Sequence, residues 1–185
     1  MKKLLFSILI SIIATHNLTA QTIIAQGICG AQGDNLTWVL TSDSVLTISG
    51  VGEMRDYSFW LHIISDYEHH FTSNSPFIRD DIRTVVIKEG VTSIGRGAFS
   101  GSRSLTTFIS YALTPPILTS NVFGGIIDYI AAADNQATFM LLYVPAQSVE
   151  LYQYYWIGFE VIAMEAKTKQ RNFFQRLFGT RRNKL

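Results

Sequence analysis

Short apolar runs alternate with polar, turn-type residues along most of the chain. Residues 36–40 and 45–49 are β-rich runs, and the polar cluster at 41–44 separates them. This arrangement predicts a β-hairpin. The glycine-bearing residues 21–35 show no regular pattern and are expected to be irregular. The aromatic-rich stretch 53–75 has weak periodicity and is expected to be helical in part.

An internal repeat follows, with an offset of 23 residues. Each unit is a short strand, a turn, an isoleucine, and an apolar–Phe pair before a glycine. The matched pairs are Ile82/Leu105, Val85/Phe108, Ile94/Ile117 and, after a slip of one residue, Ala98/Val122 and Phe99/Phe123. A third strand is expected at residues 139–144. Repeat units of roughly 20–29 residues are typical of the coils of leucine-rich-repeat solenoids.

One such coil cannot bury its own apolar edge, so neighbouring coils must stack and the open ends need caps. Stacking is expected to place Ile82, Val85, Leu105 and Phe108 in one apolar column, and Phe99 with Phe123 in a second column on the opposite wall. The predicted fold class is therefore mainly β: a short leucine-rich-repeat-like β-solenoid with an N-terminal β-hairpin cap and a C-terminal aromatic cap. The aromatic residues for the second cap are Tyr152, Tyr154, Tyr155, Trp156 and Phe159. The same aromatic set is also typical of a carbohydrate-binding platform, and this alternative stays open.

The N-terminal residues have the features of a secretory signal peptide. Lys2 and Lys3 precede a largely apolar run of about 11 residues, which is shorter than a membrane span requires, and Ala20 suits the position before a cleavage site. We therefore expect cleavage after Ala20 and a secreted, cell-surface or periplasmic location. The predicted organisation is signal peptide (1–20), N-terminal β-rich entry or cap module (21–81), repeat module with its C-terminal cap (82–165) and basic tail (166–185).

The formal net charge of +1 averages two opposite regions. Residues 21–166 contain 6 basic and 14 acidic residues, a net of −8, whereas residues 167–185 contain 7 basic and no acidic residues. Because phosphate binding needs a basic face, the acidic body argues against a nucleic acid as partner.

The basic tail, which runs from Lys167 to Leu185, has an apolar pattern of its own. Phe173, Phe174, Leu177 and Phe178 follow the i, i+1, i+4, i+5 spacing of one helix face. A basic amphipathic helix can lie on an anionic membrane surface or dock in a partner's groove, and a solvated terminus is the alternative interpretation.

Few residues carry a pattern that chemistry requires. Adjacent His69 and His70, near Asp66 and Glu68, point to different faces of a regular element and are expected in a solvated loop rather than around a metal ion. Asp80 and Asp81 are neighbours in sequence and cannot face each other across a substrate. Cys29, the single cysteine, excludes an intramolecular disulfide and is expected to be buried. We predict no catalytic activity, no cofactor and no metal.

Several motifs in series resemble a known family. Cys29-Gly30, Leu36-Thr37-Trp38, the run 46–50 and Gly52 and Met54 are similar to its entry module. Residues 75–77 stand where that family usually has Pro-Trp, the segment 85–99 resembles its repeat, and 114–116 with 142–148 resemble its closing segment, which Tyr152, Trp156 and Phe159 continue. This family is the BspA-like leucine-rich repeat (LRR_5-type) proteins of bacterial surfaces. The similarity covers about residues 29–162.

The resemblance implies a secreted or surface protein that functions in adhesion or protein–protein contact, with a host or envelope protein as partner. Strand alternation places Thr84, Val86, Thr107 and Ile109 away from the predicted core, and these four are the predicted ligand-binding residues. Two alternatives remain. One is a carbohydrate-binding or enzyme-accessory module, and the other is a membrane-peripheral structural protein that uses the tail.

Overall fold

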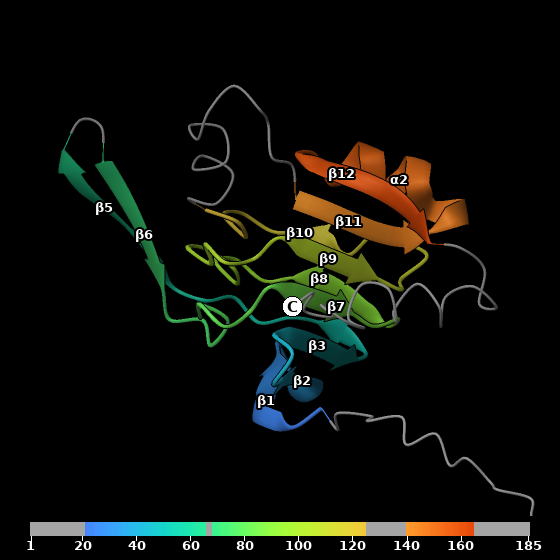
Figure 1. Ribbon diagram of the computed structural model, residues 1–185, viewed down its shortest axis with the longest axis horizontal. Helices are drawn as coiled ribbons and strands as arrows, with labels where there is room; N and C mark the ends of the chain where they lie inside the picture. Colours follow the sequence, from blue (N-terminus) through green and yellow to red (C-terminus); the bar gives the residue numbers. More distant parts are fainter. Residues whose placement is uncertain (1–20, 66–67, 125–139, 165–185) are drawn as a thin grey trace, which may run out of the picture.

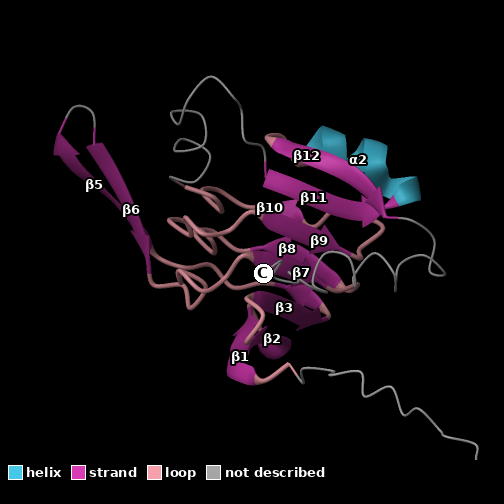
Figure 2. Cartoon of the chain, in the orientation of Figure 1, coloured by secondary structure: helices cyan, strands magenta, loops and turns pink. Residues whose placement is uncertain are grey.

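The computed structural model describes residues 21–65, 68–124 and 140–164. Strands dominate this part of the chain (Figure 2). The largest sheet, sheet A, has the strand order β1 (Ile23–Gly30), β2 (Gly33–Thr41), β3 (Val45–Gly50), β7 (Thr84–Ile87), β9 (Thr107–Ser110), β11 (Met140–Pro145) and β12 (Phe159–Met164). β1, β2 and β3 pair antiparallel, which confirms the predicted 36–49 hairpin, and the pairs from β3 to β12 are parallel.

A second parallel sheet, sheet B, contains β4 (Gly52–Glu53), β8 (Val91–Ile94) and β10 (Ile117–Leu118) in the order β10-β8-β4. The chain runs from a strand of sheet A to one of sheet B and returns, so β3–β4, β7–β8 and β9–β10 form successive coils (Figure 1). The mainly β fold class and the leucine-rich-repeat-like stacking of the coils are thereby confirmed.

The predicted match between Val85 and Phe108 is a direct strand partnership. Val85 pairs with Leu46 on one side and Phe108 on the other, and Phe108 pairs in turn with Leu142. All four side chains are fully buried. Parallel strands in register stack identical positions of successive coils, so this column forms one wall of the core.

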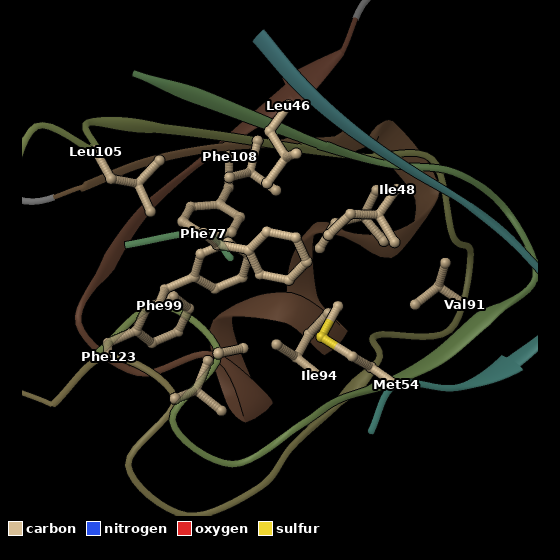
Figure 3. Packing of buried hydrophobic residues seen from close by; sticks show 14 of the residues in the cluster. Leu46, Ile48, Met54, Phe77, Val91, Ile94, Phe99, Leu105, Phe108 and Phe123 are labelled. Atoms are coloured by element: carbon tan, nitrogen blue, oxygen red, sulfur yellow. The ribbon is translucent and has the colours of Figure 1, made fainter. Parts of the chain in front are cut away.

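A column of phenylalanines fills the opposite side of the core. Phe77, Phe99 and Phe123 lie one above the next, with ring centroids 5.3 and 6.0 Å apart and interplanar angles of 25° and 12°. Phe108 from sheet A contacts Phe99 and Phe123 edge-on. Figure 3 shows these rings pointing toward one another inside the coils. The predicted second column, Phe99 with Phe123, is confirmed.

The first coil begins earlier than the sequence repeat does. β3 already pairs in parallel with β7, with Val45 opposite Thr84. The repeat is not visible there because an insertion lengthens this coil, so that Val45 and Thr84 differ by 39 positions in the sequence. The core is also continuous across the predicted module boundary after residue 81, because Ile48 and Ile87 belong to one buried cluster.

The insertion is an antiparallel hairpin made of β5 (Phe59–Ser65) and β6 (Glu68–Ser73), which extends away from the coils (Figure 1). At its base, Ser58 N–H donates to Asn74 Oδ1 at 2.9 Å, and Asn74 N–H donates to Ser58 O at 3.0 Å. The expectation of partial helix for 53–75 was wrong, since β-branched and aromatic residues favour strands. His69 and His70 lie in β6 instead of a loop.

Two other expectations need correction. Residues 23–30 form β1 rather than an irregular segment, because β2 provides a hydrogen-bonded neighbour. In sheet B, Ile94 pairs with Leu118 and not with Ile117. The extra residue in the repeat therefore precedes Ile117, where Pro115 and Pro116 lengthen the connection. Ile117 is accordingly 70% exposed, while Leu118 packs against the core.

A short helical segment closes the C-terminal end of the solenoid. The 3-10 turn η1 (Ala146–Ser148) leads into α2 (Val149–Tyr155), and β12 then returns to sheet A. Tyr152 and Trp156 are buried and belong to the core cluster. Tyr152 Oη lies 2.6 Å from Ser110 Oγ and donates to Ala112 O at 3.0 Å. These contacts attach the cap to the preceding coil.

Candidate binding surfaces

The four predicted ligand-binding residues lie together on the side of sheet A that faces away from the phenylalanine column. Thr84 pairs with Thr107, and Val86 pairs with Ile109. Alternation along the strands accounts for their shared face. Alternation predicts the face of the sheet but not how deeply each residue is buried. Ile109 is 0% exposed, Thr84 and Val86 are each 7% exposed, and Thr107 is partly exposed. Their role in ligand binding stays a prediction.

Val86 and Ile109 belong to a second buried apolar cluster, separate from the core. Its buried members come from five neighbouring parallel strands and are Val45, Val86, Ile109, Tyr143 and Met164, with Tyr111, Leu141 and Ile162 partly buried against them. We call this cluster the outer face. Strand register aligns Thr47, Val86, Ile109, Tyr143 and Ile162 in one row across it. The outer face is therefore a continuous, mostly apolar surface.

Charged groups border the outer face. Lys88 Nζ lies 4.7 Å from the centroid of the Tyr111 ring, a cation–π contact. Burial, together with the nearby carboxylate of Glu160, raises the pKa of the Tyr143 phenol. Glu160 itself is exposed on β12. The outer face is thus bordered by one cation, Lys88, and one carboxylate, Glu160.

A second candidate surface lies on the C-terminal cap. Leu151, Tyr154, Tyr155 and Ile157 are 46%, 74%, 62% and 82% exposed, respectively. We call these four residues the cap surface. The rings of Tyr154 and Tyr155 contact each other edge-on, with centroids 4.9 Å apart. Two aromatic rings are thus presented to solvent side by side, and Leu151 lies one helical turn earlier on the same side of α2.

Two hydrogen bonds, one buried and one partly buried, attach the C-terminal cap to the preceding loop. Trp156 Nε1 donates to Pro116 O at 2.9 Å, and Ser148 Oγ donates to Leu113 O at 2.8 Å. The loop itself presents exposed apolar side chains, Leu113 at 48% and Ile117 at 70%. The cap surface and this loop are consequently fixed relative to each other by contacts on both sides of α2.

The C-terminal aromatic residues separate into two groups. Tyr152 and Trp156 are almost fully buried, and Phe159 packs against the core. Their cap function agrees with the prediction. The carbohydrate platform cannot include Trp156, whose ring does not reach solvent, so any sugar-stacking surface here consists of Tyr154 and Tyr155.

The carboxylates of Asp80 and Asp81 and the thiol of Cys29, which the sequence singled out, have structural surroundings that account for them. Asp81 accepts two hydrogen bonds from Arg79, at 2.8 and 2.7 Å, and this pairing lowers the pKa of the carboxyl. Asp80 is exposed in the same turn. Cys29 is fully buried, and burial raises the pKa of its thiol to about 11. A thiol with that pKa is protonated near neutral pH and is a poor nucleophile.

Among the residues described, no group of three or more His, Cys, Asp or Glu side chains is arranged to hold a metal ion. The described helices also include none with the length and apolar character needed to cross a bilayer. The signal-like segment and the basic tail lie outside the described residues, which exclude 1–20 and 165–185.

Comparison with known proteins gives one structural likeness. No protein-family model matches the sequence, and no curated protein matches it. Among solved structures, the chain is similar to a leucine-rich repeat protein from Eubacterium ventriosum, with 19% sequence identity and a TM-score of 0.38 over 79% of this chain. The chain spans 42% of that protein's length. The strand pairing described above establishes the architecture independently of this likeness.

Proposed function

We propose that the protein is a secreted or surface-displayed module that binds another protein and catalyses no reaction. The cap surface is the observation that carries this proposal. Terminal caps of solenoids normally present a polar outer side, because an apolar one lowers solubility. Here the cap instead exposes Tyr154, Tyr155 and Ile157 by 62–82%.

Large apolar side chains that gather at an exposed surface are typical of a contact site. Tyrosine is enriched in such sites because its ring buries a large area and its hydroxyl still finds a hydrogen-bond partner. The two hydrogen bonds from Trp156 and Ser148 keep the cap surface in one arrangement. A rigid surface loses little conformational entropy on binding, which favours affinity.

The finer features of the proposal rest on the sequence. The signal-like N-terminus supports export, and the motif series from Cys29 to Ile162 supports a BspA-like protein with an adhesive function. The acidic body supports a protein partner over a nucleic acid. We propose a host-matrix or cell-envelope protein as the partner class.

The test compares two triple variants of the purified protein. In the cap variant, Tyr154, Tyr155 and Ile157 are replaced by serine. In the matched control, Ile24, Ile28 and Val51, which are 47–74% exposed elsewhere, are replaced by serine. Proteins captured from host matrix and from the source cell's envelope are identified, and binding of each is then measured with the purified partner.

We expect the cap variant to weaken binding at least 10-fold and the control to change it less than 2-fold. Equal binding by both variants would remove the cap surface as the site. A third variant, with Thr84→Lys and Thr107→Lys, tests the predicted strand-face site. Loss of binding in that variant alone, with unchanged circular dichroism, would move the site to sheet A.

The exposed Tyr154–Tyr155 pair also favours a second candidate, a carbohydrate-binding module. Aromatic rings of this kind stack on the apolar faces of sugars. Glycan-array binding that is lost on Tyr155→Ala, with unchanged circular dichroism, would support it. Binding of a protein partner by the same surface, without any glycan signal, would exclude it.

A further inference from the structure

The burial of the outer face requires a layer on top of sheet A. Ile109 is central in its row and 0% exposed, and Val86 and Tyr143 are each 7% exposed. Every described side chain in this cluster comes from a strand of sheet A, except Tyr111, which directly follows β9. An apolar sheet face becomes stable when it packs against a second element.

We propose that the chain's own C-terminal tail supplies this layer, with Phe173, Phe174, Leu177 and Phe178 packed on the outer face. This inference is independent of the cap surface and goes beyond the proposed function. It states that a segment of the same chain covers the outer face.

The position where the described chain ends supports this assignment. β12 is the last strand of sheet A, and its final residue, Met164, is a buried member of the outer face. The chain therefore enters the tail at the border of the surface to be covered. The centre of the face, Ile109 on β9, lies two strands away, about 10 Å at the usual strand spacing.

The length of the connection is sufficient. Residues 165–172 separate Met164 from Phe173, and eight residues span at most about 27 Å when extended. The whole outer face from β12 to β3 covers four strand spacings, roughly 19 Å. The aromatic residues of the tail can accordingly reach any row of the face.

The chemistry of the two surfaces is complementary. The tail has four large apolar residues at the spacing of one helix face, and the outer face is a continuous apolar row. The tail's 7 basic residues complement a body with a net charge of −8, and exposed Glu160 lies on β12, the strand at the border of the face. Burial of the apolar residues and attraction between opposite charges both favour docking.

Docking of the tail has a consequence for the predicted strand-face site. Val86 and Ile109 would be accessible to a partner only after the tail leaves, so a partner and the tail would compete. The apparent affinity of such a partner falls in proportion to the fraction of molecules in which the tail has left the outer face.

Photo-crosslinking tests the proposal in the full chain. The photoreactive residue p-benzoylphenylalanine replaces Phe174 in one protein and exposed Tyr154 in the control. After illumination, the crosslinked peptides are identified by mass spectrometry. We expect the probe at 174 to give crosslinks within one molecule, to peptides that contain Val86, Ile109 or Tyr143, and the probe at 154 to give none there.

A second measurement does not depend on the probe. Ile109→Cys, in a Cys29→Ala background, is labelled with a maleimide in the full chain and after deletion of residues 167–185. We expect labelling at least 10-fold faster without the tail, and equal labelling of the exposed control Thr37→Cys in both. If Ile109→Cys destabilises the fold, the crosslinking result decides alone.

Three results would overturn the proposal. Crosslinks between molecules would make a second copy the occupant. Crosslinks from residue 174 to other parts of the chain, or to none, would leave the outer face to a different cover. Binding of the tail to vesicles of anionic phospholipid, with no outer-face crosslink in their absence, would make the tail a membrane anchor.

Discussion

Phe77 stacks on Phe99 with ring centroids 5.3 Å apart, and Phe99 stacks in turn on Phe123. Phe99 is the central member of the column and is 0% exposed. It therefore contacts the rings of both neighbouring coils and joins three successive coils through one side chain. The stability of the solenoid should depend on this ring more than on any exposed aromatic residue.

We expect Phe99→Ala to lower the free energy of unfolding by about 3–5 kcal/mol, because it removes a buried ring and leaves a cavity between coils. Chemical denaturation monitored by circular dichroism measures the change. Tyr154→Ala, on the exposed cap surface, is the control and should change stability by no more than about 0.5 kcal/mol. Similar effects from both substitutions would contradict the central position of Phe99.

Tyr152→Phe should lower the free energy of unfolding by about 1–3 kcal/mol. The substitution retains the ring but removes the hydroxyl that contacts Ser110 Oγ and donates to Ala112 O, so a buried acceptor loses its donor. Tyr155→Phe, whose ring is 62% exposed, serves as the matched control and should be neutral. A neutral Tyr152→Phe would indicate that the cap does not depend on this bond.

Stability should fall as the pH rises above about 9. The pKa of Cys29 is raised from 9.0 to about 11 by burial, so the folded state holds its proton where the unfolded state has lost it. Its contribution is complete below pH 9 and is lost between pH 9 and 11, by up to about 1.4 kcal/mol per pH unit. Tyr152, with its pKa raised from 10.0 to about 12, adds to the loss between pH 10 and 12.

Urea denaturation at several pH values measures this dependence. Cys29→Ala should flatten the curve between pH 9 and 10, where Tyr152 contributes little. An unchanged pH profile in Cys29→Ala would show that the thiol does not ionise on unfolding in this range.

Gly95→Ala should destabilise the stacking of the first two coils by about 2 kcal/mol or more. A Cβ atom at residue 95 would overlap the carbonyl oxygen of Arg55 and lie 2.6 Å from its carbonyl carbon. Backbone atoms of the neighbouring coil cannot shift without loss of packing. Thermal unfolding measures the effect, and Thr92→Ala on the exposed side of β8 is the control.

The internal repeat was sufficient to predict how the coils stack. The 23-residue offset paired Val85 with Phe108, a slip of one residue paired Phe99 with Phe123, and both relationships hold in the structure. Such matches are local, because the same short sequence of apolar and turn residues produces the same coil each time it occurs. The position of Ile117 was wrong by one residue, because a Pro-Pro step lengthens the turn without changing the apolar pattern.

The sequence by itself determined the mainly β solenoid, the two apolar columns and the division of the charge between body and tail. Only the tertiary structure decided that the first coil begins at Val45, that residues 59–73 form an inserted hairpin, and which cap aromatics are exposed. It also decided that Ile109, on the side away from the core, is buried. Periodicity reports which side of a strand a residue occupies, whereas burial depends on segments distant in sequence that pack over that side.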